Sequence, residues 1–274
     1  MMTLETLPAC IHTASRYTAT TSERFAPIST AVTIQPLIDT GWGITSFARK
    51  GVRGVERDAY AKHVVRLAHP DLQPIAGHRC EIIATNGNTG DSAFNLMAGI
   101  FRCVCSNGLV VGSRLASIRI IHTGDAGAIH KQLSDAVHTI AGEFPALRET
   151  VEHWQSIHVE NYDRSRFGKL AQAIRTGKNV SYIDHDFAAA IANTSRRDED
   201  TSDSLWNVFN RAQENTLRGM GGRHRGITGI DSQLRINRQL WDLADATSDG
   251  KLYDVYNLAH SMSVSDALKQ ARTN

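Results

Sequence analysis

Basic residues gather in two segments of the sequence, residues 49–66 and residues 211–238. Each segment carries six Lys or Arg against two Asp or Glu, which gives each a formal net charge of +4. Arginine suits phosphate because its planar guanidinium donates two parallel hydrogen bonds, and the glycines of the loop GMGGRHRGITG allow a backbone to approach a phosphate closely. We predict phosphate binding by Arg49, Lys50, Arg53, Lys62, Arg66, Arg211, Arg218, Arg223 and Arg225.

The alternative for both segments is a solvated helix face and a mobile loop that bind no ligand. The net charge of +2 and the pI near 8.4 do not decide, because phosphate binding depends on clustered cations rather than on their total. Base stacking would need exposed aromatic rings, and we expect most candidates to lie in the core. Those candidates are Tyr60, Phe94, Phe101, Trp206 and Trp241, with Trp206 the least central to its apolar stripe.

Metal ligands are weakly indicated. Cys80, Cys103 and Cys105 could combine with His78 or His63, but zinc sites favour two to four residues between paired ligands and only one lies between the two neighbouring cysteines. We therefore expect buried, unreactive thiols. The triplet of Asp184, His185 and Asp186 is more typical of a turn or a helix cap than of a cation site. No metal and no cofactor are implied.

Catalytic signatures are missing from the sequence. The Gly-rich loop lacks both the Gly-x-Gly-x-x-Gly pattern and a following Lys-Ser or Lys-Thr, and no His-Glu-x-x-His or Gly-x-Ser-x-Gly string occurs. We expect no enzyme of a standard kind. A site assembled from distant carboxylates leaves no string, so a nuclease that uses Asp91, Asp125 or Asp184 stays open.

The composition is that of an ordinary globular protein: 274 residues, 41% hydrophobic and 21% charged. No stretch approaches the roughly 18 apolar residues that a membrane-spanning helix needs, and the first residues lack a charged region followed by an apolar run. Four cysteines without regular spacing do not form a secreted disulfide framework. We expect a cytoplasmic protein with reduced thiols.

The chain changes character along its length. Residues 1–25 are rich in Ser, Thr and Ala without periodicity, which predicts a flexible N-terminal arm. In residues 26–124, short runs such as ITSFARK, YAKHVVRLAH, RCEIIAT and SIRIIHT predict a mainly β core of antiparallel strands. Residues 125–248 have helical periodicity and form the mainly α part of the same domain, followed by a helical tail at 249–274.

These parts predict the α+β fold class, with an antiparallel sheet in the N-terminal half packed against helices from the C-terminal half. The sheet would run from about Ile44 to His122, with a break near Gly99 in its most apolar segment. Pro36 must lie in the first turn of its helix or break it. Helix caps are expected at Ser29 or Thr30, at Asp203 or Ser204, and at Asp231. Strand alternation in YAKHVVRLAH puts on its buried side Ala61, His63, Val65 and Leu67.

The segment FNLMAGIFRCVCSNGLVVG resembles the central block of a plasmid and prophage family, the domain of unknown function 932. The resemblance continues through AKHVVRLAH, NRAQENTLRG and GITGIDSQLRINRQLW, over roughly residues 25–245. It departs from the family pattern at Asn88 and Thr89, where relatives have His-Asp, which argues against a catalytic role for that turn. The block matches at Gly99, Phe101, Arg102, Val104, Cys105, Asn107, Gly108 and Leu109.

The resemblance implies a protein encoded by mobile elements and carries no activity with it. A basic sheet followed by helices looks like the core of ring-forming single-strand annealing proteins, which is an analogy of fold. We therefore expect a nucleic-acid-binding protein, a homo-oligomer that binds or anneals single-stranded DNA in recombination. The first alternative is a protein-interaction module, such as a phage or plasmid factor that counters host defence. The second is a metal-dependent nuclease.

Overall fold

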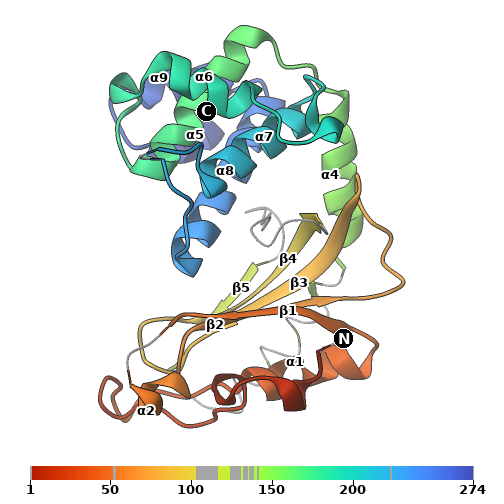
Figure 1. Ribbon diagram of the computed structural model, residues 1–274, viewed down its shortest axis with the longest axis vertical. Coiled ribbons are helices and arrows are strands. Elements are labelled where there is room, and N and C mark those ends of the chain that lie inside the picture. The colour runs from red at the N-terminus through yellow and green to blue at the C-terminus, as the bar shows by residue number, and fades with distance from the viewer. Residues whose placement is uncertain are drawn as a thin grey trace. The chain divides into compact units, whose positions relative to one another are not determined.

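The computed structural model describes residues 2–51, 54–102, 117–123, 131, 135, 139–140, 142–222 and 224–273 (Figure 1). The chain divides into two compact units. Unit 1 comprises Met1–Cys103 with Arg114–Ala146, and unit 2 comprises Val104–Ser113 with Leu147–Asn274. The predicted α+β class is confirmed, because the sheet lies in the N-terminal half and helices make up the C-terminal half. In the part of the chain that the structure describes, no helix has both the length and the apolar character needed to cross a bilayer.

Unit 1 is built on a five-stranded sheet in which every neighbouring pair is antiparallel and the strands follow chain order. Such a meander needs no crossover connection, because the end of each strand lies next to the start of the following antiparallel strand. The predicted break near Gly99 is wrong. Gly99 pairs with Glu81 in an unbroken ladder, so the strand continues to Arg102. The strands are β1 (Gly43–Arg49), β2 (His63–Ala68), β3 (His78–Asn86), β4 (Phe94–Arg102) and β5 (Ser117–Ile120).

Helix α1 (Thr30–Asp39) packs on one face of this sheet, which we call the inner face. The predicted alternation of β2 is confirmed, since His63, Val65 and Leu67 are all buried. A hydrogen-bonded chain ties helix to sheet: the Asn86 amide donates to Thr30 Oγ1 at 3.0 Å, and Thr30 Oγ1 lies 2.8 Å from His63 Nε2. Buried polar groups that are all partnered in this way fix one position of the helix on the sheet.

The start of α1 agrees with the sequence, but its interior does not. Ser29 Oγ accepts from the Val32 amide at 3.4 Å, which confirms the predicted cap. Pro36 lies inside the helix rather than in its first turn, and the helix continues to Asp39. Burial of Ile34 and Leu37, on either side of the exposed Pro36, outweighs the hydrogen bond that proline cannot make.

The N-terminal residues pack on unit 1, unlike the predicted flexible arm. Cys10 and Ile11 are part of the buried core. The Tyr17 amide donates to the Asn88 carbonyl at 3.1 Å, and the Ala26 amide donates to the His122 carbonyl at 2.8 Å. The burial of Cys10 and Ile11 could not be predicted, because two adjacent apolar residues in a Ser- and Thr-rich segment form no helical or strand periodicity.

Unit 2 is helical and is organised around aromatic side chains. The rings of Trp206, Phe209 and Trp241 lie 4.5 to 6.3 Å from that of Trp154, and all four side chains are buried. Burial of Trp206 removes it as a base-stacking candidate. The helices are α4 (Phe144–Ser156), α5 (Asn161–Thr176), α6 (His185–Asn193), α7 (Leu205–Arg218), α8 (Ile230–Ser248), α9 (Leu252–Leu258) and α10 (Val264–Thr273). Short elements are η3 (Val180–Tyr182) and η4 (Asp198–Asp200) here, and η1 (Leu4–Thr6), η2 (Ala9–Ile11) and α2 (Val55–Asp58) in unit 1.

Two predicted caps in unit 2 have different outcomes. Ser204 Oγ accepts from the Asn207 amide at 3.3 Å, so the cap of α7 is confirmed. Asp231 does not cap α8, because the helix begins at Ile230 and Gly229 occupies the cap position. Asp231 instead lies in the first turn, where its charge favours the helix dipole.

Gly168 allows α5 and α6 to approach closely. A Cβ at this position would lie 2.0 Å from the Ala188 carbonyl oxygen. We expect Gly168→Ala to lower the free energy of unfolding by about 2–3 kcal/mol, because the helices must separate to admit the methyl group. Urea unfolding followed by tryptophan fluorescence measures the change. Gly51→Ala is the matched control, since nothing lies within 4 Å of a Cβ there; equal stability of the two variants would contradict the expectation.

Candidate nucleic-acid interface

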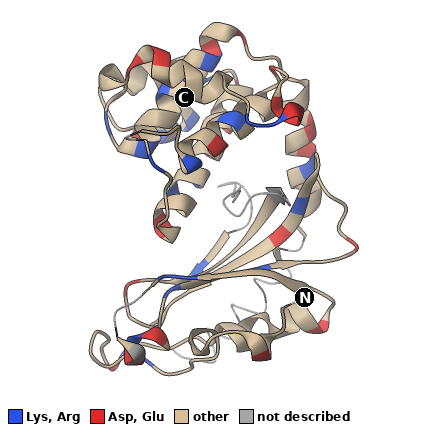
Figure 2. Cartoon of the chain, in the orientation of Figure 1, with Lys and Arg blue, Asp and Glu red and all other residues tan. Residues whose placement is uncertain are grey.

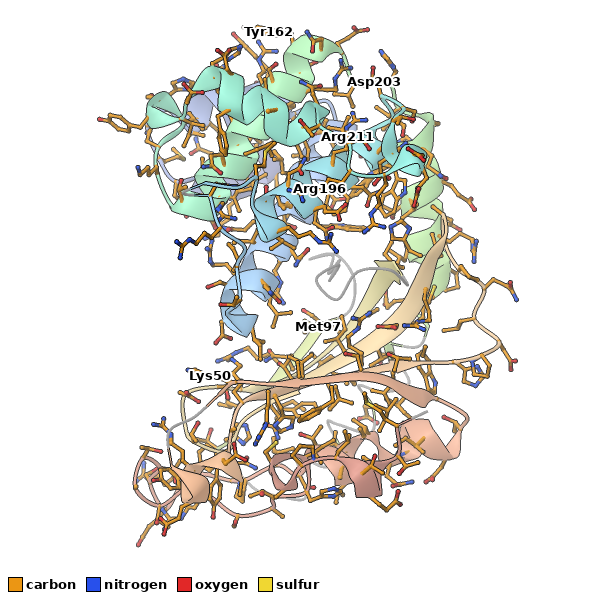
Figure 3. All side chains as sticks on the ribbon, viewed as in Figure 1. Lys50, Met97, Tyr162, Arg196, Asp203 and Arg211 are labelled. Carbon is orange, nitrogen blue, oxygen red and sulfur yellow. The ribbon has the colours of Figure 1, made fainter. Side chains whose placement is uncertain are left out.

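The face of the sheet opposite α1, here called the outer face, has basic residues on or next to four of its strands. Because side chains alternate along a strand, Val64 and Arg66 of β2 both point to this face. Their cross-strand partners on β1 and β3 point to it as well. Lys50 and Lys62 lie just beyond β1 and β2 and continue the alternation, joined by a hydrogen bond from the Lys50 amide to the Lys62 carbonyl at 2.7 Å. Lys50 lies on the same side of the sheet as Met97 of β4, away from α1 (Figure 3). The basic side chains of the outer face are Lys50, Lys62, Arg66, Arg79 and Arg119.

One carboxylate, Glu81, opposes these five cations among the outer-face side chains that the structure describes (Figure 2). Glu81 is fully buried. Its oxygens lie 2.5 Å from Arg66 Nε and 2.7 Å from Arg79 Nε, and Thr45 Oγ1 donates to it at 3.0 Å. A single negative charge between two guanidinium groups holds both arginines in place and leaves the face with excess positive charge.

The accessible cations lie at the margins of the outer face. Ile83 and Met97 fill its middle and are buried, and Lys62 is also buried. Lys50 and Arg119 are exposed, and the Arg79 side chain is 39% exposed. A phosphate could therefore be reached by the marginal cations without any change in the sheet.

One row of side chains crosses the whole outer face near Lys50. Cross-strand pairing places Ala48, Val64, Thr85, Asn95 and Arg119 side by side, one from each strand. With about 4.8 Å between neighbouring strands, the row is roughly 19 Å wide. The Asn95 amide donates to Thr85 Oγ1 at 3.1 Å, so the middle of the row is polar and ordered. The row thus ends in Arg119 at one edge of the sheet and in Ala48 at the other, where Lys50 follows two residues later, and it contains no carboxylate.

Two residues predicted to join this surface are placed elsewhere or outside the described part. Arg49 pairs in register with inner-face His63 and forms an ion pair with Asp58, so it does not belong to the outer face. Arg53 lies outside the described residues. Its role stays a prediction.

Arg79 and Arg119 belong to the outer face but were missed at the level of sequence. The signal was present, because both lie in segments predicted as strands, RCEIIAT and SIRIIHT. Continuing the alternation of β2 across the sheet would have placed them on the same face as Arg66 and Lys50, but this needs the register between strands, which sequence alone does not supply.

Arg211 is buried, whereas the phosphate binding predicted for it requires an exposed cation. Arg211 is 3% exposed, and its guanidinium donates to the carbonyls of Ala192, Asp200 and Ser202 at 2.6–2.7 Å and lies 3.3 Å from Asp203 Oδ1. Burial lowers the pKa of this guanidinium. The side chain connects α7 to the segment before it, because it supplies hydrogen-bond donors to backbone carbonyls of that segment. Four of its five N–H donors are used within the protein, and burial keeps a phosphate from reaching it.

Arg218 is committed to a carboxylate. Its Nη1 lies 3.1 Å from Glu214 Oε1, and Arg197 donates to both oxygens of the same carboxylate at 3.0 and 3.1 Å. The Arg218 side chain is still one-third exposed. It is therefore a weaker candidate than Lys50 or Arg119.

The Gly-rich loop 219–229 is fixed by arginines from outside it. Arg175 donates to the carbonyls of Thr216 and Arg225, and Arg196 donates to Asn215 Oδ1 at 2.6 Å and to the Gly219 carbonyl. These contacts satisfy carbonyls at the end of α7. The Arg225 side chain is exposed, so it remains available, whereas Arg223 lies outside the described residues.

His224 in this loop is held neutral. Its Nδ1 accepts from the Met220 amide at 3.0 Å, so Nε2 carries the proton and faces Gln172 Oε1 at 3.0 Å. Burial, followed by the nearby charge of Arg175, lowers the pKa of His224 from 6.5 to about 4. The loop contacts should therefore stabilise the fold fully above pH 6.5 and progressively less as the pH falls toward 4, because the unfolded chain takes up the proton first.

An NMR titration of the imidazole signals checks this expectation. His224 should remain neutral at a pH where a free histidine is mostly charged, and His224→Gln should reduce the loss of thermal stability between pH 7 and pH 5. A His224 signal that titrates near 6.5 would show that the loop does not hold the imidazole as described.

The other candidate sites do not assemble in the described part of the chain. Asp184 accepts from the Phe187 amide at 2.8 Å and caps α6, which confirms its interpretation as a helix cap. Asp91 accepts from Thr89 Oγ1 at 2.6 Å. No group of three His, Cys, Asp or Glu side chains there is arranged to hold a metal. Cys103, Cys105 and Asp125 lie outside the described residues.

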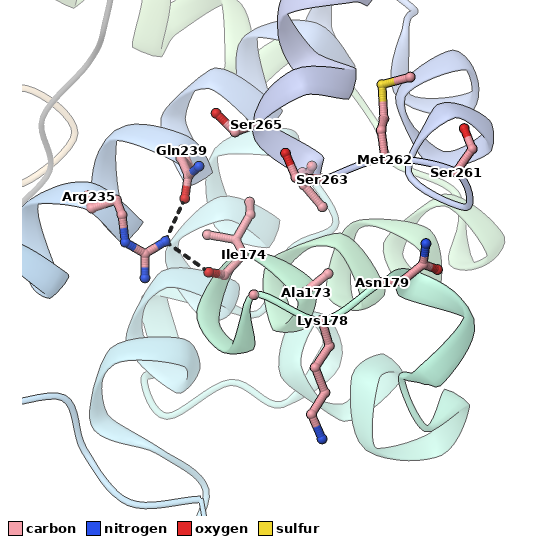
Figure 4. A pocket seen from close by; sticks show the side chains of 12 residues that line it. Ala173, Ile174, Lys178, Asn179, Arg235, Gln239, Ser261, Met262, Ser263 and Ser265 are labelled. Carbon is pink, nitrogen blue, oxygen red and sulfur yellow. Dashed lines mark hydrogen bonds between the residues drawn. The ribbon is translucent and has the colours of Figure 1, made fainter.

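Unit 2 also contains an open pocket of about 450 Å³ between the end of α5 and the start of α10 (Figure 4). Arg235 Nη1 donates to the Ile174 carbonyl at 3.1 Å and to Gln239 Oε1 at 2.9 Å. The Lys178 side chain extends away from Ser263 and Ser265 on the opposite side. Because the two cations do not converge, we do not assign the pocket to the interface.

Comparison with known proteins identifies relatives but no solved structure. The family described as Domain of unknown function (DUF932) matches residues 18–241. The chain is 31% identical over 235 residues to UPF0380 protein YafZ of Escherichia coli (strain K12), covering 82% of this chain and 83% of that protein. It is also 31% identical over 234 residues to UPF0380 protein YfjQ of the same strain, covering 82% of each. No solved structure matches significantly.

Proposed function

We propose that this chain, which belongs to the family described as Domain of unknown function (DUF932), binds single-stranded nucleic acid through the outer face of its sheet. The observation that carries the proposal is the charge of that face, which has five cations and one buried carboxylate among its described side chains. Phosphate backbones bind such surfaces without regard to sequence.

The geometry of the row across the outer face supports contact with an extended strand. Lys50 and Arg119 are exposed at opposite edges of the sheet, and the partly exposed Asn95 lies between them. Cations at two separated points favour a ligand with repeated negative charges over a single small anion. A strand bound through its phosphates would keep its bases available for pairing.

Strand annealing is the activity that this mode of binding serves best. It needs no bond-making chemistry, only a cationic surface that holds a strand extended. The proposal includes a homo-oligomer, which would place several outer faces along one strand, and the cytoplasmic location expected from the sequence.

An annealing assay with two complementary strands, one carrying a fluorophore and the other a quencher, tests the proposal. Fluorescence should fall faster with the protein than without it, at protein concentrations that saturate the strands. Magnesium or manganese is added in a parallel reaction, which is then resolved on a denaturing gel. Intact strands are expected; cleavage would replace annealing by a nuclease activity, and an unchanged annealing rate would refute the annealing activity.

A further inference from the structure

Unit 2 exposes three tyrosines while it buries its tryptophans. Among the residues described in this unit, the exposed large apolar side chains are Tyr162, Tyr182 and Tyr253, which are 66%, 81% and 55% exposed. The tryptophans of the unit are all in its core. Exposed aromatic rings are costly to leave in water, and tyrosine is enriched where a surface binds a partner.

Two of these rings are held by one arginine. The guanidinium carbon of Arg166 on α5 lies 3.9 Å from the centre of the Tyr162 ring and 4.7 Å from that of Tyr253 on α9. The Tyr256 ring is 5.8 Å away. Arg166 Nη1 also lies 2.7 Å from Asp163 Oδ1. This ion pair fixes the guanidinium on which the two rings stack. We call Tyr162, Arg166 and Tyr253 the tyrosine platform.

Charged groups of both signs lie at the platform. Asp163 neutralises Arg166, Lys169 Nζ lies 3.5 Å from the Tyr256 hydroxyl, and Asp254 follows Tyr253 in the first turn of α9. A phosphate gains little from such surroundings. A flat, uncharged ring system gains more, because it can stack on an ordered tyrosine without displacing a charge.

We infer that the tyrosine platform stacks the bases of a single-stranded nucleic acid. This inference rests on the proposed function and adds to it a contact of a different physical kind. The outer face would bind phosphates and respond to salt, whereas the platform would bind bases and respond little to salt. Every base has a π face, so the contact would not select a sequence.

Substitution of both exposed tyrosines tests the platform in the full-length protein. Tyr162→Ala with Tyr253→Ala should weaken binding of oligothymidylate by about tenfold or more, since each stacked base contributes measurably to affinity. The loss should be the same at low and high salt. Tyr162→Phe with Tyr253→Phe should retain affinity because the rings remain. Tyr182→Ala, an exposed tyrosine outside the platform, is the matched control and should bind as the wild type does.

An abasic oligonucleotide of equal length separates base stacking from contacts with the sugar-phosphate backbone. It should bind the wild type and the double alanine variant equally. If both variants bind oligothymidylate as the wild type does, the platform is refuted while the proposed function stands. If the double alanine variant loses abasic and base-containing strands alike, the rings do not act by stacking and the inference is also refuted. A wild-type protein that binds neither strand removes the proposed function and the platform together.

Discussion

Replacing Lys50 and Arg119 by glutamate is expected to weaken binding of a single-stranded oligonucleotide by about 100-fold at low salt. These two exposed cations lie at opposite edges of the outer face, Lys50 just after β1 and Arg119 in β5. Each phosphate contact on a single strand contributes about 0.7 to the slope of log K against log salt, so the double variant should lose about 1.4 from that slope. Charge reversal adds repulsion to the loss of contact.

The matched control reverses the same number of positive charges at two positions outside the outer face. Lys178→Glu with Lys269→Glu changes net charge equally, and both side chains are exposed in unit 2. The control should keep most of the affinity and the slope. Fluorescence anisotropy at several salt concentrations measures both quantities. An equal loss in the two double variants would mean that overall charge, rather than the outer face, attracts the strand.

Removal of the Glu81 carboxylate is expected to be the most destabilising change in unit 1. The side chain is fully buried between Arg66 and Arg79 and also accepts from Thr45. We expect Glu81→Leu to lower the free energy of unfolding by about 3–5 kcal/mol, because the largely buried Arg66 loses the carboxylate that faces it. Urea unfolding followed by circular dichroism measures the loss.

A second substitution shows whether the cost arises from Arg66. Arg66→Met combined with Glu81→Leu should recover at least half of the lost stability, since an apolar pair of similar volume replaces the buried ion pair. Glu81→Gln keeps the shape of the side chain and should still destabilise the protein. If Glu81→Leu unfolds at the same urea concentration as the wild type, the two arginines are not held by this carboxylate.

Local sequence patterns predicted the sheet and several helix starts for identifiable physical reasons. The β-branched runs that became β1, β2, β3 and β5 are bounded by turn residues, and alternation gave the buried side of β2 correctly. Ser29 and Ser204 were recognisable as caps because a hydroxyl before an apolar stripe satisfies a free amide.

Local sequence patterns could not predict which groups the basic side chains contact. Arg211 and Arg225 both lie in a basic segment, yet one is buried by backbone carbonyls that come from other segments and the other is exposed. Arg66 likewise finds Glu81 only through the register of β2 and β3. The tyrosine platform unites two helices that are far apart in sequence. Such contacts depend on tertiary structure, which periodicity does not specify.

The most direct test of nucleic-acid binding is fluorescence anisotropy of a labelled single strand, with a duplex of the same sequence as the comparison, at two salt concentrations. Binding should favour the single strand and weaken steeply as the salt concentration rises. Absence of binding to either nucleic acid at low salt would contradict this expectation, and would direct attention to a protein partner for the same basic face.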